Sequence, residues 1–146
     1  RGICSLIPGI ENQSENIQAI SIVDRFLEHP RVAIFEQQGD PKVLLSSADW
    51  MHRNIEERVE VSCPVYCPES KQQIIDIIDI QLQDNTKARV LNSRQSNPYH
   101  QSESDKKVRS QIAIYQYLKQ QQKNALKVIE NNDNIAENPN CERETA

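Results

Sequence analysis

A histidine and an arginine open one apolar run of the chain, and hydroxyls and a carboxylate close the next. His29 and Arg31 stand at the start of the first run, and Ser46, Ser47 and Asp49 end the second. A Gly-Asp-Pro turn separates the runs, which predicts two strands that pair as a hairpin. An imidazole, a guanidinium, hydroxyls and a carboxylate that converge in this way can act on a phosphoryl group.

Histidine suits this chemistry because it serves as acid, base or nucleophile near neutral pH. In an extended strand Arg31 leaves the same face as His29. The pattern leaves two roles open for Arg31, a contact to phosphate or an ion pair with Glu36 or Glu60.

The Ser-Ser-Ala-Asp segment also has two readings. Ser46, Ser47 and Asp49 either line the site or cap the following turn, with Asp49 as the N-cap of residues 50–54. We favour the capping role. Glu60 is expected on the polar face of a strand that follows the serine pair.

The elements that must position these residues follow from periodicity. A run apolar on both faces, 31–36, predicts a central strand covered on both sides. Segment 24–28 is expected to turn and deliver His29. Strands are expected over 2–7, 17–23, 31–36, 42–47, 58–65 and 86–91, and helices over 68–84 and 108–129. These elements indicate an α/β fold with a mixed central sheet flanked by helices.

Composition indicates one compact domain followed by polar chain. Among the 146 residues the apolar ones concentrate before Leu91. We expect a domain core over 1–91, a polar linker over 92–107, a C-terminal helix over 108–129 and a disordered tail over 130–146. The chain starts at Arg1 and runs directly into an apolar segment, so we interpret it as the C-terminal part of a longer protein.

Charge and side-chain chemistry exclude several classes of function. The net charge of −4 argues against nonspecific binding of nucleic acid. No apolar stretch reaches the roughly 18 residues of a membrane span. The four cysteines are expected as reduced thiols, and Asp76, Asp79 and Asp84 as a solvated helix face, so we predict no metal site in this chain.

The spacing of the candidate residues is similar to a known signature. His29, Arg31 and Glu36 form H-x-R-x4-E, and S-S-A-D follows ten residues later. This resembles the phospholipase D superfamily, where H-x-K-x4-D precedes G-S-x-N. Arginine replaces lysine here, glutamate replaces aspartate, and Ser46 and Asp49 replace the glycine and the asparagine. The resemblance also implies that Glu60 orients the histidine, because the superfamily often has an acid at that place.

Longer stretches resemble the C-terminal domain of bacterial polyphosphate kinase, first family. The resemblance rests on RGICSLIPG, SENIQAISIVDRFLEHPRV, GDPKVLLSSADWMHRNIEERVEV and DNTKAR, and more loosely on KKVRSQIAIYQYL. It implies a phospholipase D-like domain in an enzyme that reversibly transfers the terminal phosphate of ATP to polyphosphate.

The same resemblance implies a shared active site. A phosphohistidine and the Mg²⁺ ligands are expected on a preceding domain, so the fragment alone is expected to be inactive. Arg1 and His29 match positions that contact ATP phosphates, and His29 also suits an acid or base role. The implied partners are ATP or ADP, polyphosphate, the preceding domains and further copies in a homo-oligomer, without nucleic acid. The implied location is cytoplasmic or peripheral to the inner membrane.

Two alternatives stay open at this point. One is a phospholipase D-like phosphodiesterase that acts as a dimer, and its prediction is hydrolysis of a diester. The other is a non-enzymatic oligomerisation domain, and its prediction is that polyphosphate leaves the thermal midpoint unchanged.

Overall fold

The computed structural model describes residues 6–101 and 105–136, with side chains of the last helix described as far as Ile129. The chain divides into two compact units, Arg1–Gln111 and Ile112–Ala146. The first unit carries strands β1 (Ala19–Ile22), β2 (Val32–Phe35), β3 (Lys42–Ser46), β4 (Ser62–Pro64) and β5 (Ala88–Leu91), a π-helix η1 (Arg53–Glu57) and helix α1 (Pro68–Leu82). Helix α2 (Ser110–Ala136) begins in the first unit and forms the described part of the second.

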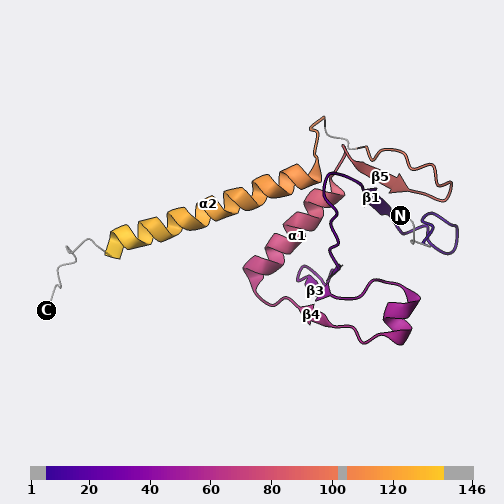
Figure 1. Ribbon diagram of the computed structural model, residues 1–146, viewed down its shortest axis with the longest axis horizontal. Helices are drawn as coiled ribbons and strands as arrows, with labels where there is room; N and C mark the ends of the chain where they lie inside the picture. Colours follow the sequence, from indigo (N-terminus) through magenta and orange to yellow (C-terminus); the bar gives the residue numbers. More distant parts are fainter. Residues whose placement is uncertain (1–5, 102–104, 137–146) are drawn as a thin grey trace. The chain divides into compact units, whose positions relative to one another are not determined.

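The strands form two small antiparallel sheets, not the single mixed central sheet that we expected. One sheet has the order β2-β3-β4, and the other pairs β1 with β5 (Figure 1). A short turn joins β2 to β3 as an antiparallel hairpin. The connection from β3 to β4 is longer and contains η1. The α/β class is confirmed, and its sheet arrangement is corrected.

The central strand of the larger sheet is β3, whereas we expected the run 31–36 to be central and covered. Val43 of β3 is only 1% exposed, while Phe35 of β2 is 52% exposed. β2 lies at the sheet edge because it pairs with β3 alone. An apolar run in the sequence therefore does not show that both faces of the strand are covered by other elements.

Several expected boundaries also shift. Leu6 and Ile7 lie outside any strand, and the remainder of the expected first strand falls outside the described residues. Strand β4 occupies only the end of the expected run 58–65. Helix α1 starts at Pro68, which has no amide hydrogen to leave unpaired in a first turn. Helix α2 continues to Ala136, so residues 130–136 are helical where we expected the tail.

The larger sheet brings the candidate residues together at one end of its strands. The backbone amide of Ser46 donates to the Arg31 carbonyl at 2.8 Å, and the Ser47 amide donates to the Val61 carbonyl at 2.9 Å. The start of β2, the end of β3 and the start of β4 therefore meet there. Neither helix, over its described residues, is long and apolar enough to span a membrane.

Candidate phosphoryl-binding site

One carboxylate joins the histidine and the arginine at this end of the larger sheet. Asp49 Oδ1 accepts a hydrogen bond from Arg31 Nε at 2.8 Å and lies 2.8 Å from His29 Nε2. The side chain of His29 is 56% exposed, whereas those of Arg31 and Asp49 are 31% and 23% exposed. We call these three residues the His29 cluster. The imidazole of His29 thus lies at the surface and contacts the partly buried Arg31–Asp49 ion pair.

The hydrogen bonds within the His29 cluster determine which of its groups carry protons. Hydrogen bonds from Arg31 and then from His29 hold the pKa of the Asp49 carboxyl below its usual value. The hydrogen bond to Asp49 in turn raises the pKa of the Arg31 guanidinium. Because an ionised carboxylate only accepts hydrogen bonds, the proton at this contact sits on His29 Nε2. The other ring nitrogen, Nδ1, has no hydrogen-bond partner among the described residues.

A second polar cluster lies beside the first. Ser47 Oγ donates a hydrogen bond to Glu60 and accepts one from the Val61 amide at 3.1 Å. Glu60 also accepts from Asn54 Nδ2 at 2.7 Å. Hydrogen bonds from Ser47 and then Asn54 lower the pKa of the Glu60 carboxyl. These bonds fasten the end of β3 to the chain that enters β4.

The structure corrects two of the contacts that we considered. Glu60 holds Ser47 and Asn54, so Asp49 instead of Glu60 orients the histidine. Arg31 pairs with Asp49 and not with Glu36. Glu36 instead accepts from the Gly39 amide at 2.8 Å, in the β2–β3 turn.

The capping role of Asp49 is wrong as well. The π-helix starts at Arg53, with His52 as an N-cap that makes no side-chain capping bond. Ser46 Oγ accepts from the Ala48 amide at 3.1 Å and from Ser62 Oγ at 2.9 Å, which links β3 to β4. Arg1 lies outside the described residues.

The loop that delivers His29 is fastened at two points to the start of α2. The guanidinium of Arg109 binds both oxygens of Asp24, at 2.7 and 2.5 Å. The amide of Gln111 pairs with the backbone of Phe26, accepting from its N–H at 3.1 Å and donating to its carbonyl at 2.7 Å. The hydrogen bond with Arg109 lowers the pKa of Asp24, whose side chain is only 2% exposed. Two long-range anchors therefore precede His29 within five residues.

A buried carboxylate holds the start of α2 in place. Asp84 is fully buried, not on the solvated helix face that we expected. Its Oδ1 accepts from the amides of Thr86, Lys87 and Ala88 at 2.6–3.1 Å, and its Oδ2 accepts from the Ser110 amide at 2.7 Å. Burial raises the pKa of this carboxyl, but the amide hydrogen bonds outweigh burial and lower it to about 2.

Sequence patterns gave no direct sign of these supports. The partners of the two loop anchors are 85 residues apart in the chain, and no local period connects them. Asp84 carries a weak signal, because Asp-Asn after a helix commonly closes a turn by accepting nearby amides. Its contact with Ser110 has no such local signal.

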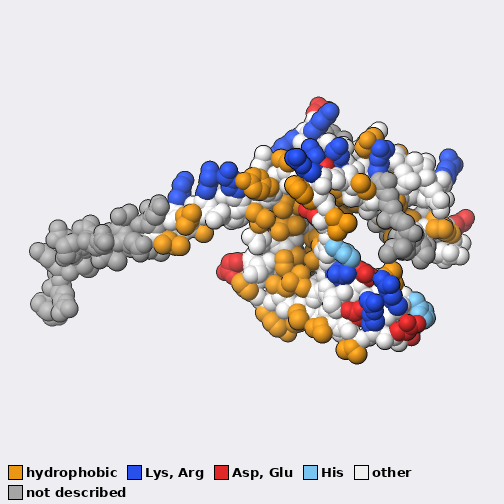
Figure 2. All heavy atoms as spheres, in the orientation of Figure 1, with side chains coloured by type: hydrophobic (Ala, Val, Ile, Leu, Met, Phe, Trp, Pro, Cys, Tyr) orange, Lys and Arg blue, Asp and Glu red, His pale blue; other side chains and the backbone are white. Residues whose placement is uncertain are grey.

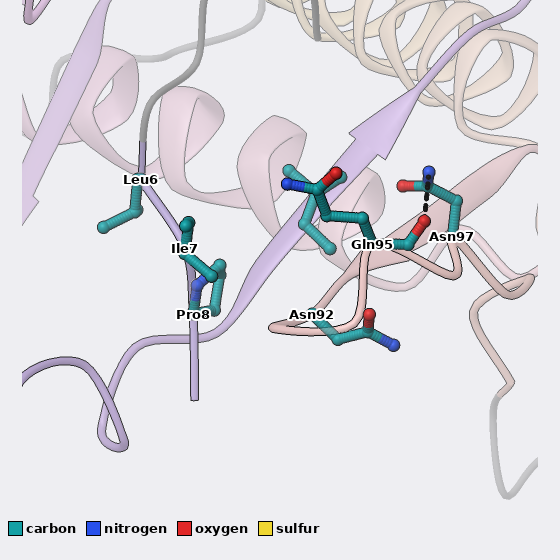
Figure 3. A pocket seen from close by; sticks show the side chains of 7 residues that line it. Leu6, Ile7, Pro8, Asn92, Gln95 and Asn97 are labelled. Atoms are coloured by element: carbon teal, nitrogen blue, oxygen red, sulfur yellow. Dashed lines mark hydrogen bonds between the residues drawn. The ribbon is translucent and has the colours of Figure 1, made fainter. Parts of the chain in front are cut away.

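Two hollows of the first unit lie near these elements but lack the chemistry of a phosphate site. A pocket of about 200 Å³ is lined by uncharged residues alone, including Leu6, Ile7, Asn92 and Gln95 (Figure 3). A hollow of about 310 Å³ lies beside the His29 loop, with Glu28 as its one charged lining residue. A third hollow, of about 480 Å³, is lined by His100 and Lys107 but also by Asp105. We favour the His29 cluster as the candidate for an anion, because a histidine and an arginine meet there on one carboxylate.

The cluster does not suit Mg²⁺. Asp49 already bonds to two nitrogen groups through one oxygen, and a cationic arginine stands beside it. No group of three or more His, Cys, Asp and Glu side chains able to hold a metal is found in the part of the chain that the structure describes. These residues therefore do not fit a magnesium site.

Comparison with known proteins identifies a family for this chain. Residues 1–111 match the family described as Polyphosphate kinase C-terminal domain 2. A polyphosphate kinase of Vibrio vulnificus is 55% identical over 137 residues, which cover 92% of this chain and 20% of the relative. A polyphosphate kinase of Escherichia coli is 57% identical over 119 residues, which cover 82% of this chain and 17% of the relative.

A solved structure is similar over most of the chain. The crystal structure of polyphosphate kinase from Porphyromonas gingivalis aligns with a TM-score of 0.79 and 46% identity, covering 84% of this chain and 19% of that chain. The chain thus spans about a fifth of the length of these relatives. With a family match over residues 1–111, the chain belongs to the polyphosphate kinase family and carries its C-terminal domain 2.

Proposed function

We propose that this chain forms one wall of a phosphoryl-transfer site that moves the terminal phosphate of ATP reversibly onto polyphosphate. The observation that carries the proposal is the His29 cluster, an exposed imidazole held on a partly buried Arg31–Asp49 pair. The names of the relatives supply the reaction class. The histidine that takes the phosphoryl group is expected in the part of the enzyme outside this chain.

In this proposal His29 Nδ1 faces the substrate. Asp49 holds the Nε2 proton, so the neutral ring offers a lone pair at Nδ1, and the protonated ring offers a donor to a phosphate oxygen. Asp49 also fixes the ring orientation, which reduces the loss of side-chain freedom when phosphate binds. Arg31 contributes positive charge beside the ring, and Arg1 is proposed as a further phosphate contact.

The exposure of His29 supports a shared site. Phosphoryl transfer depends on positioning and electrostatic stabilisation, which are strongest where water is excluded. A ring that is 56% exposed lies open to solvent, and a second wall from the rest of the enzyme would enclose it. We therefore propose that the chain alone binds phosphate weakly and does not turn over. Mg²⁺, if the reaction uses it, is held by other parts of the enzyme.

His29→Ala in the full-length enzyme tests this proposal. We expect ATP-dependent polyphosphate synthesis to fall by about 100-fold or more, the range that a positioned acid–base group contributes. The matched control is His52→Ala, because His52 is also a surface histidine but makes only a 3.7 Å contact with Glu57. Synthesis that stays unchanged in His29→Ala removes this residue from the mechanism.

A further inference from the structure

Positive charge gathers in and before α2 of an otherwise acidic chain. Between residues 106 and 129 there are six cationic side chains and no aspartate or glutamate, although the whole chain has a net charge of −4. The six cations are Lys106, Lys107, Arg109, Lys119, Lys123 and Lys127. Arg109 is paired with Asp24. Such an asymmetry indicates an anionic partner.

Three of these cations form one stripe within the second unit. Lys119, Lys123 and Lys127 follow at intervals of four residues, so each step advances about 6 Å along the helix and turns about 40° around it. All three are exposed. Figure 2 shows cationic side chains following one another along α2. We call these three residues the lysine stripe.

The lysine stripe lacks ion-pair partners among the side chains that the structure describes. None of the three lysines forms an ion pair with a residue that the structure describes, and Lys119 lies 5.7 Å from the Tyr115 ring. Like charges four residues apart destabilise an isolated helix, whereas a glutamate at one of these positions would stabilise it. The spacing of Lys119, Lys123 and Lys127 therefore costs helix stability, and the first acidic residue along the chain after them is Glu130.

We propose that the lysine stripe binds a chain of inorganic polyphosphate. The choice of this anion rests on the proposed function. A linear polyanion offers charge at every phosphate, so successive lysines along the helix contact successive segments of one chain. Lysine suits such contacts, because its ammonium binds phosphate as a point charge without a fixed fork geometry. The stripe adds affinity for long chains and takes no part in the transfer reaction.

The test is the salt dependence of binding in the full-length protein. Each lysine that contacts a polyanion releases counterions, and three contacts contribute about 2 to the slope of log affinity against log salt. We expect the triple variant K119Q/K123Q/K127Q to bind end-labelled long-chain polyphosphate with a slope smaller by about 2. A fourfold rise in salt then narrows the gap between wild type and variant about 16-fold. Lysine and glutamine have similar helix propensities, so the fold is retained.

Two controls separate the stripe from overall charge. The triple variant Lys42→Gln, Arg53→Gln, Arg94→Gln removes the same net charge from exposed positions outside α2 and should keep the wild-type slope. The double variant Lys123→Gln, Gln121→Lys keeps the charge of the helix but moves its middle lysine about 160° around the axis. It should lose part of the slope.

The outcomes are decisive in both directions. An unchanged slope in the stripe variant, or an equal loss in the scattered-charge control, overturns the proposal. Binding of single-stranded RNA or anionic lipid vesicles with greater affinity than polyphosphate overturns the choice of ligand. Turnover with tripolyphosphate, which is too short to contact all three lysines, should stay at the wild-type level in the stripe variant. His29→Ala tests the transfer site alone, so the two proposals fail independently.

Discussion

Asp49 illustrates how one oxygen sets the chemistry of two neighbours. Its Oδ1 binds Arg31 and His29 together, so the imidazole tautomer, the ring orientation and the charge of the pair depend on a single carboxylate. Charge-assisted hydrogen bonds of this kind are stronger and shorter than neutral ones. Asp49 stands where the phospholipase D signature has an asparagine, so this difference adds a negative charge.

Asp49→Asn in the full-length enzyme should reduce phosphoryl transfer by about 10- to 100-fold. A hydrogen bond to a charged group contributes about 1.5–3 kcal/mol, and asparagine keeps the oxygen but loses the charge. The measurement is the initial rate of polyphosphate synthesis, with the thermal midpoint as a check on folding. Asp40→Asn is the matched control, because Asp40 pairs with Lys71 at an exposed site. A rate that stays within twofold of wild type would show that Asp49 does not position His29.

At the scale of elements, the start of α2 acts on the loop that carries His29. Arg109 and Gln111 reach the loop at Asp24 and Phe26, and Asp84 in turn binds the Ser110 amide. The first amides of a helix lack partners within the helix, and here the buried Asp84 side chain accepts a hydrogen bond from the first amide of α2. The position of His29 therefore depends on contacts that start at the end of α1.

Gln111→Leu should loosen this loop without unfolding the domain. It removes both hydrogen bonds to Phe26, each worth about 0.5–1.5 kcal/mol. Amide hydrogen exchange over residues 24–29 of the full-length protein should then accelerate by about tenfold. Gln120→Leu is the control, because the side chain of Gln120 bonds to Asn124 on the same helix and to no other residue that the structure describes. Equal exchange in both variants would rule out the anchor.

At the scale of the whole molecule, the first unit is held by polar contacts as much as by its core. Only two apolar residues of the described chain are fully buried, Val43 and Ala88. Several large side chains stand in solvent, among them Leu27 at 94% exposed and Val59 at 98%. The buried carboxylate of Asp84, with four backbone amide donors, is one of the polar contacts inside this unit.

The low pKa of Asp84 predicts a specific acid response. A folded-state pKa of about 2 lies below the usual 3.8, so the carboxylate stabilises the fold fully above pH about 4, and this stabilisation is lost as the pH falls towards 2. The shift corresponds to about 2 kcal/mol. Asp84→Asn should lower stability at pH 7, and the gap to wild type should narrow between pH 4 and 2.

Acid titration followed by circular dichroism measures this response. Asp79→Asn is the control, because Asp79 lies exposed on α1. Since asparagine presents one acceptor and one amino group to a site lined by amide donors, the cost at neutral pH should exceed that of the control by about 2 kcal/mol or more. A difference in stability between wild type and Asp84→Asn that stays constant down to pH 2 would contradict the lowered pKa of Asp84.

The sequence by itself determined the family, the α/β class, both helices, and the short strands at 19–22, 32–35, 42–46 and 88–91. These features depend on local periodicity and on contiguous motifs, which a chain displays without folding. It also identified His29, Arg31 and Asp49 as candidates for one site. It assigned Asp49 the wrong contact, because a capping side chain and a charged partner look alike in a local pattern.

Tertiary structure alone decided how these parts are joined. Two separate antiparallel sheets, the exposure of β2, and the anchors of Asp24, Phe26 and Asp84 depend on residues that are distant in the chain. Apolar runs predict strands but not their neighbours, and a carboxylate shows no sign of burial until its amide donors surround it. The orientation of His29 belongs to this second group, because Asp49 reaches it only across the paired strands.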